Sequence, residues 1–252
     1  MVIVKKEEVN QIPYLHVVKQ QLENTPLPVV IFMHGFESVK ERNLQYAYML
    51  AEKGLRVVMP DALFHGERGE TANRKLQFWN IIITAIHDLQ VIKEELMRRD
   101  LIKDERIGLA GTSMGGIITL GAMVRYQWIK AAVSLMGSPA YVDFAQKQLE
   151  TLRHNQIPIP YTEQQIENIF LTLQEYDATL HIQKWNYCPI LFWHGKQDEV
   201  VPYQPAYQFY TFLKPEYKER EIPISFILDE KAGHAVPNQG VIATLDWLVE
   251  YV

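Results

Sequence analysis

The sequence has a single cysteine, Cys188, among 252 residues, which excludes an internal disulfide and a zinc site built on several cysteines. It has no basic cluster: 25 Lys and Arg residues stand against 30 Asp and Glu, and this balance gives no electrostatic sign of nucleic-acid binding. Its longest apolar runs, such as PVVIFMHGF at 28–36, are too short to span a membrane. The first ten residues, MVIVKKEEVN, carry acids where an export signal has an apolar stretch. We therefore expect a cytoplasmic protein that binds neither nucleic acid nor membrane; the oligomeric state is left open.

Strand-like and helix-like segments alternate along the chain, which predicts an α/β fold with a mostly parallel sheet and helices on both faces. Apolar, β-rich runs predict strands at 12–18, 28–34, 55–60, 105–111, 129–137, 188–195 and 223–229, and helical periodicity predicts helices at about 40–53, 73–99, 114–126, 203–213 and 240–252. We find no repeat or linker, so 1–252 is predicted to be one domain. Residues 138–187 break the alternation and are predicted to form a small cap inserted between two strands.

The stretch AGTSMGG, residues 110–116, places Ser113 directly after a predicted strand and directly before a predicted helix. A nucleophile elbow needs this context, in which the serine sits in a strained turn that projects its hydroxyl. Gly111 and Gly115 remove side chains that would collide with the neighbouring backbone. The alternative is a glycine-rich turn without chemistry, but the position between strand and helix favours a nucleophile.

A serine nucleophile needs a base that is oriented by a third group. His234, in AGHAVP, follows the last predicted strand, and Asp198, in LFWHGKQDEVVP, follows the strand before it. Asp229 and Asp246 are rival acids. We choose Asp198 because it is close to a strand end, and the order Ser113, Asp198, His234 is that of hydrolases with this elbow.

The oxyanion of such a reaction needs fixed N–H donors. We expect one to be the backbone N–H of Met114, directly after the nucleophile. The other is expected to be the N–H of Phe36 in HGF, after the strand at 28–34, where Gly35 would allow a close approach of the backbone.

These motifs, together with FMHGF and MPDALFHGERG, resemble the α/β-hydrolase superfamily over essentially the whole chain. The sequence is most similar to small bacterial esterases allied to dienelactone hydrolases and to the catalytic domains of prolyl-oligopeptidase-like enzymes. The resemblance implies an eight-stranded, mainly parallel sheet, and the same triad and oxyanion donors. Two departures are the lack of room for a propeller domain and a serine where true dienelactone hydrolases have cysteine.

The residues and the resemblance together predict a serine carboxylesterase that cleaves small-molecule esters through an acyl-enzyme, without a cofactor or metal. A peptidase or amidase using the same triad is the first alternative, and a non-catalytic binding protein on this scaffold is the second. A dehalogenase or epoxide hydrolase is disfavoured because Ser113 replaces their nucleophilic carboxylate.

His65, in FHGERG, either contacts substrate or belongs to a structural turn, and His34 and His194 are expected to orient loops. A zinc site of His34, His65, His194 and His234 lacks any short ligand spacing.

Overall fold

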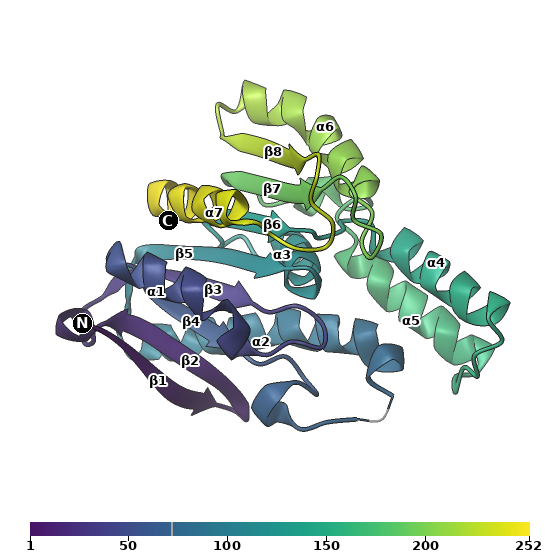
Figure 1. Cartoon of the computed structure of the whole chain (residues 1–252), viewed down its shortest axis with the longest axis horizontal. Coiled ribbons are helices and arrows are strands. Elements are labelled where there is room, and N and C mark those ends of the chain that lie inside the picture. The colour runs from purple at the N-terminus through teal and green to yellow at the C-terminus, as the bar shows by residue number, and fades with distance from the viewer. Residues whose placement is uncertain (72) are drawn as a thin grey trace.

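A twisted sheet runs through the centre of the computed structural model, which describes residues 1–71 and 73–252 (Figure 1). Within these residues the sheet has eight strands in the order β1-β2-β4-β3-β5-β6-β7-β8. β1 and β2 are antiparallel to their neighbours, and β3 to β8 are parallel. The strands are β1 (Val2–Val9), β2 (Ile12–Lys19), β3 (Leu27–Met33), β4 (Arg56–Pro60), β5 (Ile102–Thr112), β6 (Ala131–Leu135), β7 (Ile190–Gly195) and β8 (Ile224–Asp229).

Helices cover both faces of the sheet, and each face has its own apolar core. α1 (Leu44–Glu52) and α7 (Asn238–Tyr251) pack on one face, and α2 (Phe78–Arg98), α3 (Met114–Arg125) and α6 (Gln204–Glu219) pack on the other. Short 3₁₀ turns lie at Gln20–Leu22, Lys40–Asn43 (η2), Gly66–Arg68 (η3), Arg74–Gln77 (η4) and Ile182–Lys184. The predicted fold class is confirmed. Among the described residues, no helix combines the length and the apolar character that crossing a membrane requires.

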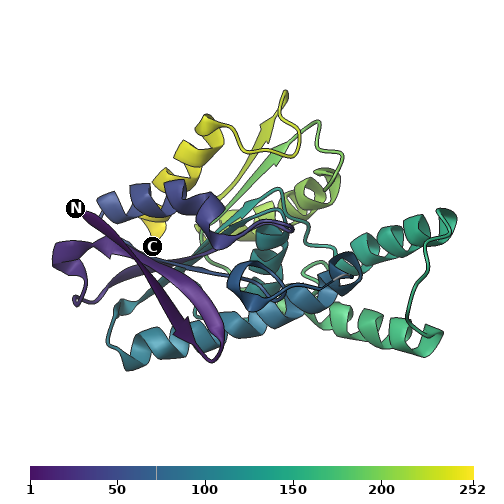
Figure 2. The same ribbon diagram turned by 60° about the horizontal axis from the view of Figure 1, so that its bottom comes forward.

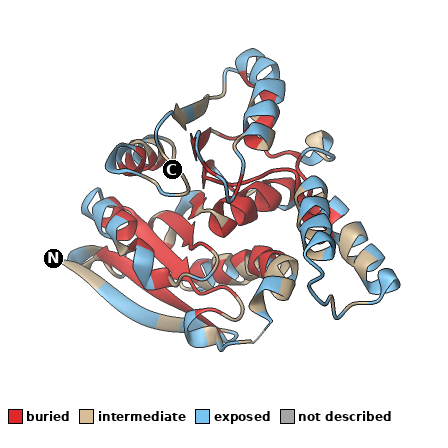
Figure 3. Ribbon diagram, turned by 45° about the vertical axis from the view of Figure 1, so that its right-hand side comes forward, coloured by how far each residue is buried: buried red, intermediate tan, exposed pale blue. Residues whose placement is uncertain are grey.

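The middle strands of the sheet are largely buried because helices cover them from both sides (Figure 3). Every residue of β4, β6 and β7 is buried, as expected for parallel strands with continuous apolar runs. The parallel strands therefore all end at one edge of a rigid layer. In open sheets of this kind, ligands bind outside that edge.

β1 is an element that the sequence patterns did not predict. It pairs with β2 over its full length through a hairpin whose two-residue turn, Asn10–Gln11, has positive φ at both positions. Such a turn matches the twist of the flanking strands. Charged side chains such as Lys5 and Lys6 point to solvent from this edge strand, which makes it look like a polar segment in the sequence.

The chain between β6 and β7 forms a helical hairpin. α4 (Tyr141–His154) and α5 (Glu163–Tyr176) project together from one end of the sheet (Figure 2). The irregular stretch NQIPIPY joins them, and Thr162 begins α5 with a capping box that it forms with Gln165. Both helices bury few residues, so they form a thin layer on the body of the protein.

Candidate active site

Ser113 occupies the sharp turn between β5 and α3. Its φ of 55° is unusual for a residue other than glycine, and it precedes the first helical residue, Met114. Two hydrogen bonds hold the turn: the Ser113 N–H donates to the Leu135 carbonyl at 2.7 Å, and the Ile117 N–H donates to the Ser113 carbonyl at 2.9 Å. The strained conformation expected from the sequence is therefore present.

Gly111 and Gly115 allow this turn because their backbones pack too closely for a side chain. A Cβ on Gly111 would lie 2.4 Å from the Gly115 carbonyl carbon, and one on Gly115 would lie 2.1 Å from the Met33 oxygen. A Cβ on Gly35 would lie 3.4 Å from the Thr112 oxygen and 3.5 Å from the Ser113 Cβ, so it would stand beside the nucleophile. That this glycine lets the backbone approach a reacting carbonyl stays a prediction.

The structure brings the three residues of the predicted triad into one hydrogen-bonded chain. His234 Nε2 lies 2.8 Å from Ser113 Oγ, and its Nδ1 lies 2.7 Å from Asp198 Oδ2. Asp198 follows the end of β7 and His234 follows the end of β8, so the three side chains meet at the C-terminal edge of the parallel strands. This arrangement can move a proton from the serine hydroxyl to the imidazole.

Asp198 is fully buried and is held as a carboxylate. Burial alone would raise its pKa, but hydrogen bonding from His194, His234 and the Val201 N–H holds the pKa well below its usual range. Oδ1 accepts the N–H groups of Val200 and Val201, each at 2.9 Å. The buried negative charge therefore faces His234 in a fixed direction.

The rival acid Asp229 is engaged elsewhere. Its Oδ1 accepts the N–H groups of Lys231 at 2.9 Å and Ala232 at 3.0 Å, and this closes the turn that leads to His234. Asp246 lies within α7. His194 follows the expectation for a loop-orienting residue, since its Nε2 donates to the Val201 carbonyl at 2.7 Å.

The two predicted oxyanion donors have free N–H groups. In the part of the chain that the structure describes, no acceptor pairs with the N–H of Phe36 or of Met114. Met114 is the first residue of α3, whose N-terminus favours negative charge. Phe36 is the second residue of a turn that the Ser38 N–H closes on the Gly35 carbonyl at 3.2 Å.

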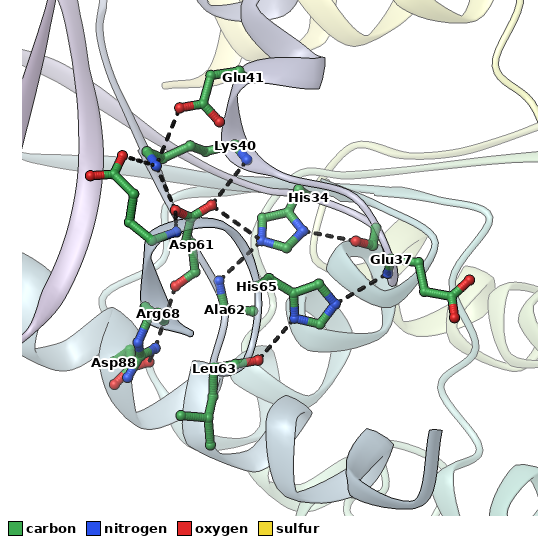
Figure 4. A network of polar contacts seen from close by, with 12 residues as sticks. His34, Glu37, Lys40, Glu41, Asp61, Ala62, Leu63, His65, Arg68 and Asp88 are labelled. Atoms are coloured by element: carbon green, nitrogen blue, oxygen red, sulfur yellow. Dashed lines mark hydrogen bonds and ion pairs between the residues drawn. The ribbon is translucent and has the colours of Figure 1, made fainter. Parts of the chain in front are cut away.

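Two histidines form hydrogen bonds with this turn (Figure 4). His34 Nε2 accepts the Ala62 N–H at 3.0 Å, so its Nδ1–H donates to the Gly35 carbonyl at 2.8 Å. His65 Nε2 accepts the Glu37 N–H at 3.1 Å. Burial lowers the pKa of His34 to about 4 and also lowers the pKa of His65. Of the two interpretations of His65, the structural one fits: the side chain is buried beneath the loop.

A buried ion pair that the sequence patterns did not reveal supports the same loop. Lys40, from η2, binds Asp61, directly after β4, and also Glu67 at 2.7 Å. Burial alone would lower the pKa of Lys40, but the carboxylates of Asp61 and Glu67 raise it above its ordinary value. The position of Asp61 at a strand end was the signal available in the sequence, but its partner lies 21 residues earlier.

Comparison with known proteins places the chain in a family. Residues 42–252 match the family model of prolyl oligopeptidases. The chain belongs to the prolyl oligopeptidase family. It is 46% identical to "Putative esterase YitV" of Bacillus subtilis (strain 168), with complete coverage of both chains. It is also 32% identical to "Esterase YjfP" of Escherichia coli (strain K12), with 90% of each chain covered. The resemblance predicted from the motifs is confirmed.

The fold of this prolyl oligopeptidase family member is shared with solved structures. The crystal structure of TT1662 from Thermus thermophilus aligns over the whole of both chains with a TM-score of 0.76 at 18% identity. Such a likeness shows the fold alone. It agrees with the eight-stranded sheet and its helical layers.

A cavity of about 670 Å³ opens from Ser113 between the sheet edge and the α4–α5 hairpin of this family member. Its wall is largely apolar and includes Phe78, Trp79, Phe144, Ile169 and Phe170. The volume lies within the range of pockets that bind drug-sized ligands. The cavity therefore exceeds what an acetyl group needs and offers an apolar surface for a larger group.

Polar contacts join the hairpin to the beginning of α2 across this cavity. Trp79 Nε1 donates to Gln148 Oε1 at 2.8 Å, and Gln77 Nε2 donates to the Tyr161 hydroxyl at 2.9 Å. Nothing along the chain indicates the contact of Tyr161 with Gln77, which is 84 residues away. Among the described residues, no group of three His, Cys, Asp or Glu side chains could hold a metal ion.

Proposed function

We propose that this chain is a serine carboxylesterase in which Ser113, His234 and Asp198 form the catalytic triad. The observation that carries the proposal is the hydrogen-bonded chain from Ser113 Oγ through His234 to Asp198, at the opening of an apolar cavity. The esterase names of the two relatives support it.

In the first step, His234 takes the hydroxyl proton of Ser113 while the oxygen attacks the ester carbonyl. The N–H groups of Phe36 and Met114 bind the oxyanion, and the Asp198 carboxylate stabilises the imidazolium. His234 then protonates the departing alcohol, which leaves an acyl-enzyme. Water attacks this intermediate with His234 again as base, and the carboxylic acid is released.

Residues 138–187 act as a cap in this proposal. Side chains of α4 and α5 line the cavity that contains Ser113, so the acyl or alcohol group of a small-molecule ester would pack against them. We place the enzyme in the cytoplasm, without nucleic-acid or membrane partners, on the acidic charge balance and the single buried cysteine.

Substitution of the nucleophile tests the proposal. Ser113→Ala should abolish both covalent labelling by a fluorophosphonate probe and turnover of p-nitrophenyl esters, because no other group then forms the acyl-enzyme. Ser138→Ala is the matched control, since Ser138 is a second serine in the wall of the same cavity. Persistent labelling of Ser113→Ala, or loss of labelling in Ser138→Ala alone, would contradict the assignment.

An amidase or peptidase is the second candidate, and the match to the prolyl oligopeptidase family supports it. An amine is a poorer leaving group than an alcohol, so amide cleavage needs better protonation of the departing nitrogen. Comparing an aryl ester with the matching anilide decides between the two. We expect the ester to be cleaved far faster; comparable kcat/KM values for the two would indicate an amidase.

A further inference from the structure

The turn that carries Phe36 has an unusual backbone for its sequence. Glu37, its third residue, has a φ of 58°, and together with the Ser38 to Gly35 hydrogen bond this is the pattern of a type II turn. That position normally holds glycine or asparagine, because other side chains strain it. An interaction that keeps the turn in this form would offset the strain at Glu37.

His65 provides such an interaction. Its Nδ1–H donates to the Leu63 carbonyl at 2.9 Å, which fixes the tautomer and leaves the Nε2 lone pair to accept the Glu37 N–H at 3.1 Å. The ring is almost completely buried, and the Phe36 ring packs against its edge at 5.5 Å between centroids. His65 is thus anchored at one nitrogen and holds the turn with the other.

The peptide that His65 holds is the one that distinguishes the two common turn types. The bond between Phe36 and Glu37 points in opposite directions in type I and type II turns, because ψ of the second residue changes sign. In a type I turn the Glu37 N–H would leave His65, and the buried Nε2 would lose its donor. The N–H of Phe36 belongs to the preceding peptide, and φ of the second residue is about −60° in both turn types. An effect of His65 on this donor therefore comes through anchoring of the turn as a whole, by the hydrogen bond to Glu37 and the contact with the Phe36 ring.

We propose that His65 is a positioning residue of the oxyanion hole: by accepting the Glu37 N–H, it holds the 35–38 turn in the form that presents the Phe36 N–H to the reacting carbonyl. The inference rests on the proposed ester hydrolysis and goes beyond it, because His65 touches neither substrate nor triad. It predicts that the role lies at Nε2 and not in the ring as a whole.

Two substitutions at His65 distinguish the role of Nε2 from that of Nδ1. In His65→Gln the side-chain oxygen reaches the place of Nε2 and can accept the Glu37 N–H, whereas the shorter amide of His65→Asn reaches only the place of Nδ1 and the Leu63 carbonyl. With p-nitrophenyl acetate, we expect His65→Asn to lower kcat by about 10- to 100-fold, somewhat less than the loss of a whole oxyanion donor, with little change in KM. His65→Gln should stay within about threefold of the wild-type kcat. Equal losses in both variants, or a loss confined to KM, would overturn the inference.

A second substitution tests whether His65 acts through the turn. Glu37→Gly removes the strain at positive φ, so the turn should depend less on His65. We expect His65→Asn to cost at least about fivefold less kcat in the Glu37→Gly background than in the wild type, as a double-mutant cycle measures. The double variant can still be measured if His65→Asn alone folds poorly, since Glu37→Gly removes the backbone strain in the same turn. An equal cost in both backgrounds would overturn the inference.

The outcomes separate this inference from the proposed function. If the wild type shows no Ser113-dependent ester turnover, both fall together. If the wild type hydrolyses the ester but the His65 variants or the double-mutant cycle give one of the contradictory results named above, only the role of His65 falls.

Discussion

At the scale of single residues, the site depends on polar atoms that each have a fixed partner. Asp198 accepts two backbone N–H groups with one oxygen and His234 with the other, so neither the carboxylate nor the imidazole can turn freely. The tautomer of His234 follows from this contact: Nδ1 carries the proton and Nε2 faces Ser113 as an acceptor.

Replacement of Asp198 should therefore act through the tautomer of His234. Asp198→Asn can still accept the N–H groups of Val200 and Val201, but its amide can donate to Nδ1 and leave the proton on Nε2. We expect kcat for a p-nitrophenyl ester to fall by about 10³- to 10⁴-fold, as in other triads. Asp229→Asn, at the rival acid, is the control and should retain most of the activity. Similar losses in both variants would show that Asp198 is not the triad acid.

Chain order and strand ends were sufficient to predict that Ser113, Asp198 and His234 lie together, because parallel strands bring their C-terminal ends together. The partners of His65 and Lys40 could not be predicted in the same way. Their contacts depend on how the loops after β3 and β4 fold against each other, and the sequence carries no periodic pattern for that.

At the scale of elements, the α4–α5 hairpin shapes the cavity, and α5 does so with one side of the helix. Ile169 on α5 lines the cavity, whereas Leu171, two residues later, is 53% exposed on the other side of the helix. Helical geometry separates these positions by about 200° around the axis. The two positions therefore form a matched pair for testing which surface meets the substrate.

Filling the cavity from α5 should shorten the acyl chains that the enzyme prefers. Ile169→Trp adds volume inside the cavity, so the ratio of kcat/KM for p-nitrophenyl octanoate to that for the acetate should fall by about 10-fold or more, which equals the loss of one to two buried methylene contacts. Leu171→Trp should leave this ratio close to that of the wild type. A ratio that Ile169→Trp does not change would show that the acyl chain does not enter this part of the cavity.

The elements themselves were largely predictable. Apolar runs marked β3, β4, β6 and β7 because both faces of these strands are covered. β1 was missed because an edge strand with one solvated face needs few apolar residues. Residues 138–187 were predicted only as a small cap, since the angle of its helices to the sheet depends on side-chain contacts such as Trp79 with Gln148.

At the scale of the whole molecule, stability couples to pH through groups buried under the catalytic edge. His34 is almost completely buried, and its pKa of about 4 in the folded protein lies below the ordinary 6.5 of the unfolded chain. Between these values the unfolded chain binds more protons than the folded one, so the free energy of unfolding falls as the pH decreases through this window.

Removal of His34 should therefore weaken the pH dependence of unfolding. Between about pH 7.5 and about pH 5, the wild type should lose about 2 kcal/mol more unfolding free energy than His34→Asn, as measured by urea denaturation. His154→Asn, which replaces an exposed histidine at the end of α4, is the control and should follow the wild type. Parallel curves for wild type and His34→Asn would show that His34 is not a buried neutral group.

The hairpin leaves the sheet after β6 and returns at β7, and these two strands are direct neighbours in the sheet. The positions where the hairpin leaves and re-enters the sheet are therefore set by the pairing of β6 with β7, which does not involve the hairpin itself. Segments of other lengths can be grafted between the same two strands without changing the register on which Ser113 and Asp198 depend. Selectivity can thus diversify in one exchangeable module while the reaction chemistry is inherited unchanged.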